Sequence, residues 1–434
     1  MNTRLDVAGI GVGPFNLSVA ALLAPLSELK TAFFERRPAF NWHPGMMLAG
    51  TRLQTSFLKD LVTSADPTSR YSFLAYLVAQ GRFYRFINAE FPRIERREFA
   101  DYLRWVAEQL PNLRFGNEIR EVRHNGERFV LHFADQTVEA EQLVVATGSV
   151  PHVPDWGAPH LGEQALHASQ YMTTPFSAKG KRVVVIGGGQ SGAEIVLDLM
   201  AGKRGEAASI TLLSRRPTLE PLDESPFTNE FFTPEYVGAF HRLPQERKAA
   251  IVERQKLASD GISPDTLRQL TQAIYVADFL SPDNSRPSLL PFREVCAMRR
   301  DGKTLRLTMH NGFDGQDEQM DADLVIFATG YRSALPSCLA PLSDRLRRDR
   351  HGRLALREDF SAEWDGPAGQ RLFFQNAGRL SHGIADPQLS LAAWRSAVIV
   401  NSLLGRRHYN DSDAATPLNW TAPQASPAST TVAA

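Results

Sequence analysis

Two glycine-rich turns of the same type stand about 180 residues apart in this chain of 434 residues. The first reads DVAGIGVGPFN and the second VVVIGGGQSGAE, and each follows an apolar stretch and precedes a helix-like one. Glycine in such a turn lets the backbone approach a pyrophosphate, which then lies at the N-terminus of the helix. Two turns therefore predict two dinucleotide sites. The residues expected to hold them are Gly9, Gly11, Gly13 and Pro14 in the first turn, and Gly187, Gly188, Gly189, Gln190, Ser191 and Gly192 in the second.

The strand that follows each turn ends in a different kind of residue. After the first turn, TAFFE ends in Glu35, whose carboxylate would accept hydrogen bonds from an unmodified ribose. After the second, SITLLSRR ends in Arg215 and Arg216, and arginine suits a ribose phosphate. We therefore expect FAD at the first turn and NADPH at the second. Pro14 departs from the simple pattern, because it stands where the third glycine would be.

Composition narrows the class of protein. The 48 basic and 48 acidic residues balance, so neither a nucleic acid nor a membrane surface is indicated as a partner. Cys296 and Cys338 form no CxxC pair, and no His/Cys cluster predicts a metal site. No apolar run reaches the roughly 18 residues of a membrane helix. The N-terminus runs directly into the first strand and leaves no room for a secretory signal, so a cytoplasmic location is expected.

The chain predicts an α/β fold with two Rossmann-like dinucleotide-binding domains, the NADPH domain being inserted into the FAD domain. We expect FAD-domain residues at 1–175 and 366–410, the NADPH domain at 176–365, and a mostly helical substrate region at about 219–280. The tail from 411 to 434 is rich in Ala, Thr, Pro and Ser and is expected to be disordered. Two ATG segments, which contain Thr147 and Thr329, follow apolar strands and are expected to close over the cofactors.

Several longer motifs carry a resemblance to a known family. WHPGM at 42–46, LQTSFLKDL at 53–61, FATGYRSALP at 327–336 and SHGIADPQLSL at 381–391 closely resemble the microbial N-hydroxylating flavin monooxygenases of siderophore synthesis. The family contains lysine, ornithine and diamine N-monooxygenases. It implies FAD, NADPH, dioxygen, a small primary amine as substrate, and commonly a homotetramer. In this chemistry a neutral amine attacks a C4a-hydroperoxyflavin, and the protein must keep water away.

The resemblance also implies roles for single residues. Gln54 matches a glutamine that faces the flavin, and Lys59 a lysine that binds the carboxylate of amino acid substrates. Asn229 matches an asparagine that holds the polar head of the substrate, and Ser390 lies in the segment beside flavin and substrate; with Gln54 these two are the expected catalytic residues. The substrate end is further expected to include Glu230, Phe231 and Phe232. Further cofactor contacts are expected from Trp42, His43, Val122, Pro387, Gln388 and Leu389.

The choice of amine rests on two departures from the lysine branch, which the chain otherwise matches best through WHPGM, DYLRW and FTPEY. Asn229 resembles the ornithine type. Asp278 could pair with the second ammonium of a diamine, although as a plain loop residue it would face water. We therefore expect putrescine or cadaverine as substrate, with L-lysine as the alternative and L-ornithine as a weaker one. A simple NADPH-linked flavin reductase is the alternative of another class, but the redox cysteine pair that a disulfide reductase needs is missing from the sequence.

Overall fold

Strands from both ends of the chain build the first sheet of the computed structural model, which describes residues 3–281, 286–412 and 416–421. The strand order is β3-β2-β1-β6-β5-β4, and β17 pairs with β6 beside this path. β1, β2, β3, β6 and β17 are parallel, whereas β4 and β5 are antiparallel. The strands are β1 (Thr3–Ile10), β2 (Thr31–Glu35), β3 (Leu113–Phe115), β4 (Glu121–His124), β5 (Phe129–His132), β6 (Thr137–Val145) and β17 (Leu372–Phe374).

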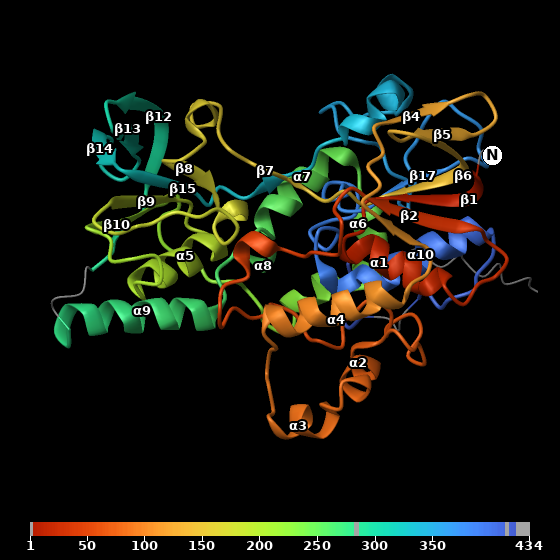
Figure 1. Ribbon diagram of the computed structural model, residues 1–434, viewed down its shortest axis with the longest axis horizontal. Helices are drawn as coiled ribbons and strands as arrows, with labels where there is room; N and C mark the ends of the chain where they lie inside the picture. The colour runs from red at the N-terminus through yellow and green to blue at the C-terminus, as the bar shows by residue number, and fades with distance from the viewer. Residues whose placement is uncertain (1–2, 282–285, 413–415, 422–434) are drawn as a thin grey trace, which may run out of the picture.

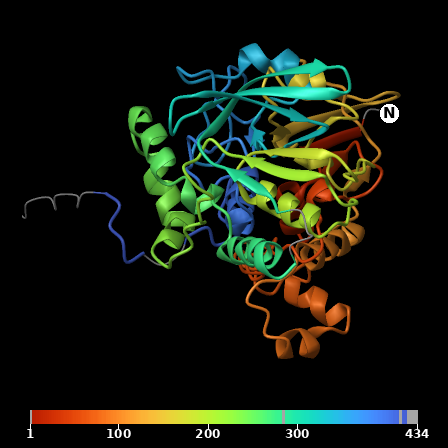
Figure 2. The same cartoon turned by 90° about the vertical axis from the view of Figure 1, so that its left-hand side faces the viewer.

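One helix is enclosed on all sides in this half of the molecule. Every residue of α1 (Pro14–Leu23) is buried, which explains why its sequence is apolar without a polar face. α1 packs against α4 (Arg96–Gln109) and α10 (Ala392–Leu404), so the C-terminal part of the chain covers the first glycine turn's helix. An arm made of α2 (Phe73–Ala79) and α3 (Phe83–Asn88) projects from this half in both views (Figures 1 and 2).

The second sheet is fully parallel, with the order β11-β10-β9-β15-β8, and lies beside the first (Figure 1). Its strands are β8 (Ala165–His167), β9 (Arg182–Ile186), β10 (Ser209–Leu213), β11 (Ser288–Leu290) and β15 (Leu324–Phe327). α5 (Gln190–Met200) and α9 (Pro264–Phe279) pack on it together. The antiparallel strands β12 (Arg293–Asp301), β13 (Thr304–Asn311) and β14 (Asp317–Ala322) share a core with the second sheet. The expected α/β fold with two Rossmann-like sheets is confirmed.

Two short strands cross between the halves. β7 (Val150–Pro151) pairs antiparallel with β16 (Tyr331–Arg332). Between β10 and α9 the chain forms η4 (Thr228–Phe232), α6 (Pro234–His241), α7 (Gln245–Arg254) and α8 (Leu257–Asp260). α6 contributes Tyr236 and Val237 to apolar clusters that contain Ile384 and Ala385 of the C-terminal part. The remaining short helices are η1 (Pro44–Met46), η2 (Ala158–His160), η3 (Ala168–Gln170), η5 (Ser337–Arg345) and η6 (Leu389–Leu391).

The pairing differs from the expected boundaries at 175 and 366. β8 pairs with β15, so the second sheet already includes residues 165–167. η5 buries Leu339 and Leu342 in the core of the first sheet, so the chain has returned to that half well before residue 366. Both segments are short and lack a strong periodic pattern, and their place is decided by pairing partners far away in the sequence.

Part of the tail expected to be disordered is packed. The Trp394 indole donates to the backbone oxygen of Asp411 at 2.8 Å, and Trp420 stacks edge-on against Tyr236 with ring centroids 4.8 Å apart. The other residues of this tail, 413–415 and 422–434, lie outside the described residues. Across the described ranges, no helix is long and apolar enough to cross a membrane.

Two glycines of the turns are required by packing. A side chain at Gly9 would meet the Phe33 ring at 1.9 Å, and one at Gly192 would meet the backbone oxygen of Gly187 at 2.0 Å. Both glycines therefore allow a helix or strand to approach its neighbour closely.

Gly192→Ala is expected to lower the free energy of unfolding by about 1–3 kcal/mol, because the backbone of residue 187 must shift. Gly238→Ala is the matched control: it lies inside α6, where a methyl group meets nothing nearer than 3.5 Å, and should raise stability by up to roughly 1 kcal/mol. Thermal and urea unfolding of both variants measure the difference. Equal effects of the two substitutions would show that close packing at Gly192 is unimportant.

Candidate active site

A cavity of about 1790 Å³ lies where the carboxyl ends of the two sheets meet. Its walls come from the loops that follow β1, β6, β9 and β15, together with η4 and the segment 386–390. In open α/β sheets, ligands bind outside the carboxyl ends of the strands, which is where this cavity opens. Thr147 and Thr329, the threonines of the two ATG segments, both line it.

The first glycine turn forms a cradle for an anionic group. Gly13 is the N-cap of α1, and a side chain there would meet no atom within 4 Å, so the space in front of the helix is open. Gly11 has a φ of +83°, which favours glycine. Glu35 lines the cavity and accepts a 2.9 Å hydrogen bond from the Val12 backbone N–H. The open helix end and the carboxylate fit the pyrophosphate and ribose of FAD.

The second turn repeats this geometry on α5. Gly189 is the N-cap, with open space where a side chain would be. Arg215 is exposed and lines the cavity, and it has no ion-pair or hydrogen-bond partner among the described residues. Arg216, by contrast, pairs with Glu220 at 3.4 Å and donates to the backbone oxygen of Asp260. Of the two arginines, Arg215 is therefore the one free to meet a ribose phosphate, as NADPH requires.

A polar network joins the two halves beside the second turn. The Gln54 amide donates to Gln190 Oε1 at 3.4 Å, and Gln190 donates to Glu194 Oε1 at 2.8 Å. Glu194 in turn receives both arms of the Arg96 guanidinium, at 2.7 and 2.9 Å. Gln54 and Arg96 belong to the first half and the other two to α5. The network thus fixes the loop that carries Gln54 against the helix of the second turn.

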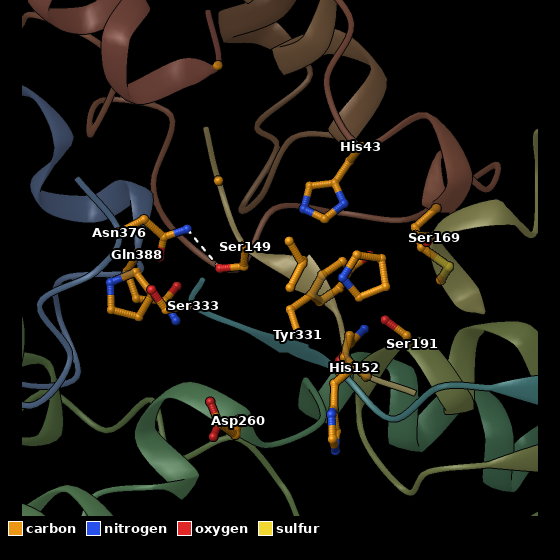
Figure 3. Close-up of a pocket in the computed structure, with 18 of the residues that line it drawn as sticks. His43, Ser149, His152, Ser169, Ser191, Asp260, Tyr331, Ser333, Asn376 and Gln388 are labelled. Carbon is orange, nitrogen blue, oxygen red and sulfur yellow. Dashed lines mark hydrogen bonds between the residues drawn. The ribbon is translucent and has the colours of Figure 1, made fainter. Parts of the chain in front are cut away.

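His43 lies in the cavity in a left-handed conformation, with a φ of 49°. Burial, with a further contribution from the nearby Arg96 charge, lowers the pKa of His43 to about 4. The imidazole is therefore neutral at physiological pH and adds no charge to the site. Figure 3 shows it pointing toward Tyr331, with ring centroids 6.3 Å apart. Trp42 also lines the cavity.

Lys59, Asn229 and Phe232 line a further part of the cavity. Lys59 is half-buried and has no ion-pair partner in the part of the chain that the structure describes. Burial lowers the pKa of Lys59, and the nearby charge of Glu230 partly opposes this shift. Asn229 donates from its side chain to the backbone oxygen of Glu224. The arrangement offers a cation and an amide to a polar substrate head.

The segment that contains Pro387, Gln388, Leu389 and Ser390 also faces the cavity. Ser390 Oγ is buried and has no hydrogen-bond partner among the described residues, so it can bind a ligand group. The segment is held by a fully buried ion pair at 2.8 Å between Asp386 and Arg395 of α10. Asp386 also accepts from the Gly378 N–H at 2.8 Å.

Other expected site residues lie outside the cavity lining. Val122 is fully buried in the core of the first sheet. Gly9 and Gly192 act through packing instead, and neither Glu230 nor Phe231 is among the residues that line the cavity. Except for Val122, these positions flank lining residues in the chain, and spacing alone cannot tell which neighbour faces inward.

The expectation for Asp278 is corrected by the course of α9. The backbone N–H of Ser263, the N-cap of this helix, donates to Gln190 at 2.7 Å. Asp278 lies near the other end of α9, about 22 Å further along the axis at 1.5 Å per residue. There it pairs with Arg286 at 3.4 Å, and it does not line the cavity. Because α9 continues without a break, the carboxylate is carried away from the site.

Sequence reasoning missed Arg96, Glu194, Asp386 and Arg395. Each lies within or beside a motif that was noticed, but an ion pair between residues 98 apart leaves no local signal. A charged residue in an apolar helix, such as Arg395 within AAWRSAVIV, was the one available hint.

Known proteins resemble this chain along nearly its whole length. Residues 3–333 match the family model of L-lysine 6-monooxygenase/L-ornithine 5-monooxygenase. The L-lysine N6-monooxygenase of Escherichia coli is 40% identical over 424 residues, covering 97% of this chain and 99% of the relative. The cadaverine monooxygenase DfoA of Erwinia amylovora, solved with FAD, superposes with a TM-score of 0.90 at 30% identity, covering 98% of this chain and 100% of its own.

A second solved structure adds the nicotinamide. The ornithine N-hydroxylase KtzI of Kutzneria sp. 744, solved with reduced FAD, NADP⁺ and L-ornithine, has a TM-score of 0.84 at 29% identity and covers 93% of this chain and 100% of its own. The chain therefore belongs to the L-lysine 6-monooxygenase/L-ornithine 5-monooxygenase family, and it is a flavin-dependent N-monooxygenase that uses FAD and NADP(H) to hydroxylate an amine for siderophore biosynthesis.

Proposed function

We propose that the substrate is L-lysine and that its side-chain amine is hydroxylated. The observation that carries this proposal is the half-buried Lys59 in the cavity wall, which has no ion-pair partner among the described residues. Partial burial without an ion-pair partner is unfavourable for a cation, and the carboxylate of an amino acid would offset that cost. The diamine hypothesis rested on Asp278, which already pairs with Arg286 outside the cavity. The 40% identical lysine enzyme supports the same choice.

A diamine remains the second candidate because one carboxylate lies near Lys59. Burial lowers the pKa of Lys59 and the nearby charge of Glu230 opposes this shift, so a negative charge acts in this part of the site and would attract a second ammonium. The resemblance to a cadaverine monooxygenase supports this candidate as well. L-Ornithine is one methylene shorter than L-lysine and carries the same α-carboxylate, so it would also use Lys59.

In this proposal the residues divide into two groups. Lys59 binds the α-carboxylate of lysine, and Asn229 orients the α-carbon end. Gln54 and Ser390 offer hydrogen-bonding groups where the side-chain amine reaches the flavin. Bound FAD would supply the redox chemistry, in which NADPH provides a hydride, one oxygen atom of O2 is transferred to the amine and the other is released as water. Neutral His43, Trp42 and Leu389 keep the nearby space poor in charge and water.

The amine must reach the oxygen in its neutral form, with a free lone pair. Gln54 and neutral His43 can accept a hydrogen bond from the amine, and neither carries a negative charge that would hold the amine in its ammonium form. We also propose a preference for NADPH over NADH, through Arg215, and a homotetrameric assembly. The exposed Val78, Tyr84 and Ile87 of the α2–α3 arm support a surface for subunit contact.

The substrate proposal is tested with purified enzyme, NADPH and a panel of L-lysine, L-ornithine, putrescine and cadaverine. We expect hydroxylamine formation to be fastest with lysine. Lys59→Ala should raise the KM for lysine by roughly a hundredfold, because a charge-assisted contact is lost, and change diamine turnover much less. Lys303→Ala, an exposed lysine on the β12–β13 turn, is the control and should leave both unchanged. An enzyme that prefers a diamine and ignores lysine would overturn the proposal.

Gln54→Ala should separate reduction from hydroxylation. The Gln54 side chain contacts Gln190 of α5 but is proposed to act in oxygen transfer and not in nicotinamide binding. Flavin reduction by NADPH should therefore stay within about twofold of wild type. The fraction of NADPH that ends as hydrogen peroxide should rise severalfold relative to hydroxylated amine. Stopped-flow reduction and a peroxide assay measure the two quantities. Slower reduction with unchanged coupling would assign Gln54 to nicotinamide binding instead.

Arg215→Ala should weaken the use of NADPH by roughly thirtyfold in kcat/KM, the effect of one lost charge-assisted contact. Its effect on NADH should be small, because NADH lacks the phosphate. Arg216→Ala is the matched comparison; its guanidinium already pairs with Glu220, so a smaller change in NADPH preference is expected. An equal loss of kcat/KM with NADPH and with NADH would show that Arg215 does not bind the ribose phosphate.

A further inference from the structure

Trp420 packs against the helical region from behind, although it belongs to the C-terminal tail. Its ring centroid is 4.8 Å from that of Tyr236 on α6 and 5.7 Å from that of Phe231 on η4. Phe231 and Tyr236 also contact each other, at 5.2 Å, so the three rings form one cluster. The Trp420 indole N–H is buried without an acceptor in the described structure, so aromatic packing and not a hydrogen bond holds it.

Two faces of η4 therefore make different contacts, one with the cavity and one with the aromatic cluster. Asn229 and Phe232 line the cavity, whereas Phe231 points to the aromatic cluster that contains Trp420. A 3₁₀ helix of five residues has no stable form of its own, and its position depends on what it packs against. Trp420 is one of the two rings that hold Phe231.

The tail that brings Trp420 to η4 is attached at two places. Asp411 accepts from the Trp394 indole at 2.8 Å and from Asn401 at 3.1 Å, and both donors are on α10. The Thr416 N–H donates to Glu235 Oε2 at 2.6 Å, at the start of α6. The described parts of the tail thus contact both the first half of the molecule, through Asp411, and the helical region, through Thr416.

We propose that Trp420 is a positioning residue for the amine substrate: by packing behind Phe231, its indole holds η4 so that Asn229 and Phe232 face the cavity. This inference rests on the proposed assignment of η4 to the substrate end, but it does not depend on which amine is used. It predicts a specific loss. Without the indole, η4 loosens, the amine binds less tightly, and the two dinucleotide cradles, which lie on other elements, are unaffected.

The test uses Trp420→Ala in the full-length chain with FAD bound. We expect the KM for the amine that wild type prefers to rise about tenfold, the effect of losing two aromatic contacts. The KM for NADPH and the rate of flavin reduction should stay within twofold. The shift in melting temperature that saturating amine produces should shrink in the variant. Trp420→Phe, which keeps a ring in the cluster, should restore most of both.

Phe313→Ala is the control for loss of an exposed aromatic. Phe313 lies on the β13–β14 turn, outside the helical region that contains η4. Its ring contacts that of Phe292, with centroids 5.5 Å apart. It should leave every quantity unchanged. If Trp420→Ala lowers the melting temperature but leaves the amine KM and the amine-induced shift at wild-type values, Trp420 has only a stabilising role and the inference is wrong. A wild-type enzyme inactive with lysine but active with a diamine would overturn the substrate proposal alone, since the Trp420 comparison is then made with the diamine.

Discussion

The bidentate ion pair between Arg96 and Glu194 is the contact on which the cavity depends. It joins the first turn of α4 to α5, and both N–O distances are below 3 Å. Glu194 is only 5% exposed, so removing one partner would leave an almost fully buried charge and cost about 3–5 kcal/mol. Because the walls of the cavity come from both sheets, its shape depends on the relative position of the two halves. Gln190 extends the same network to Gln54, the residue proposed to act on the oxygen.

The cavity combines fixed charges with neutral groups whose protonation does not change near physiological pH. The buried pair of Asp386 and Arg395 carries no net charge and fixes the segment that ends in Ser390. His43 stays neutral because burial lowers its pKa to about 4. Of the cavity-lining residues discussed above, Lys59 and Arg215 are the cations without a partner among the described residues. The carboxylate of an amino acid would match Lys59, and the ribose phosphate of NADPH would match Arg215.

The predicted residues that the structure brings to the cavity wall are those with local causes. Glycine turns, the N-termini of α1 and α5, Glu35 and Arg215 are linked within about 30 residues, and their relation follows from strand–turn–helix geometry. Positions that depend on where an element leads were not predictable in this way. Asp278 was wrongly expected in the site because no local feature shows that α9 runs away from it. Val122 was wrongly expected there because residues of a strand alternate between its two faces, and the sequence does not show which face of β4 is buried in the core. The packing of Trp420 depends on rings about 190 residues earlier, which a tail rich in Ala, Thr and Pro gives no reason to expect.

The pairing of β17 with β6 has a consequence for synthesis of the chain. All strands of the second sheet have been made once residue 327 leaves the ribosome, whereas the first sheet waits for residues 372–374 and for α10 to cover α1. Domains fold as units during synthesis. The second dinucleotide unit can thus fold while the first still lacks β17, and the first cradle is completed last. We therefore expect FAD to bind late in synthesis of the chain. A chain that ends before residue 372 would contain the NADP(H) cradle but an incomplete flavin cradle.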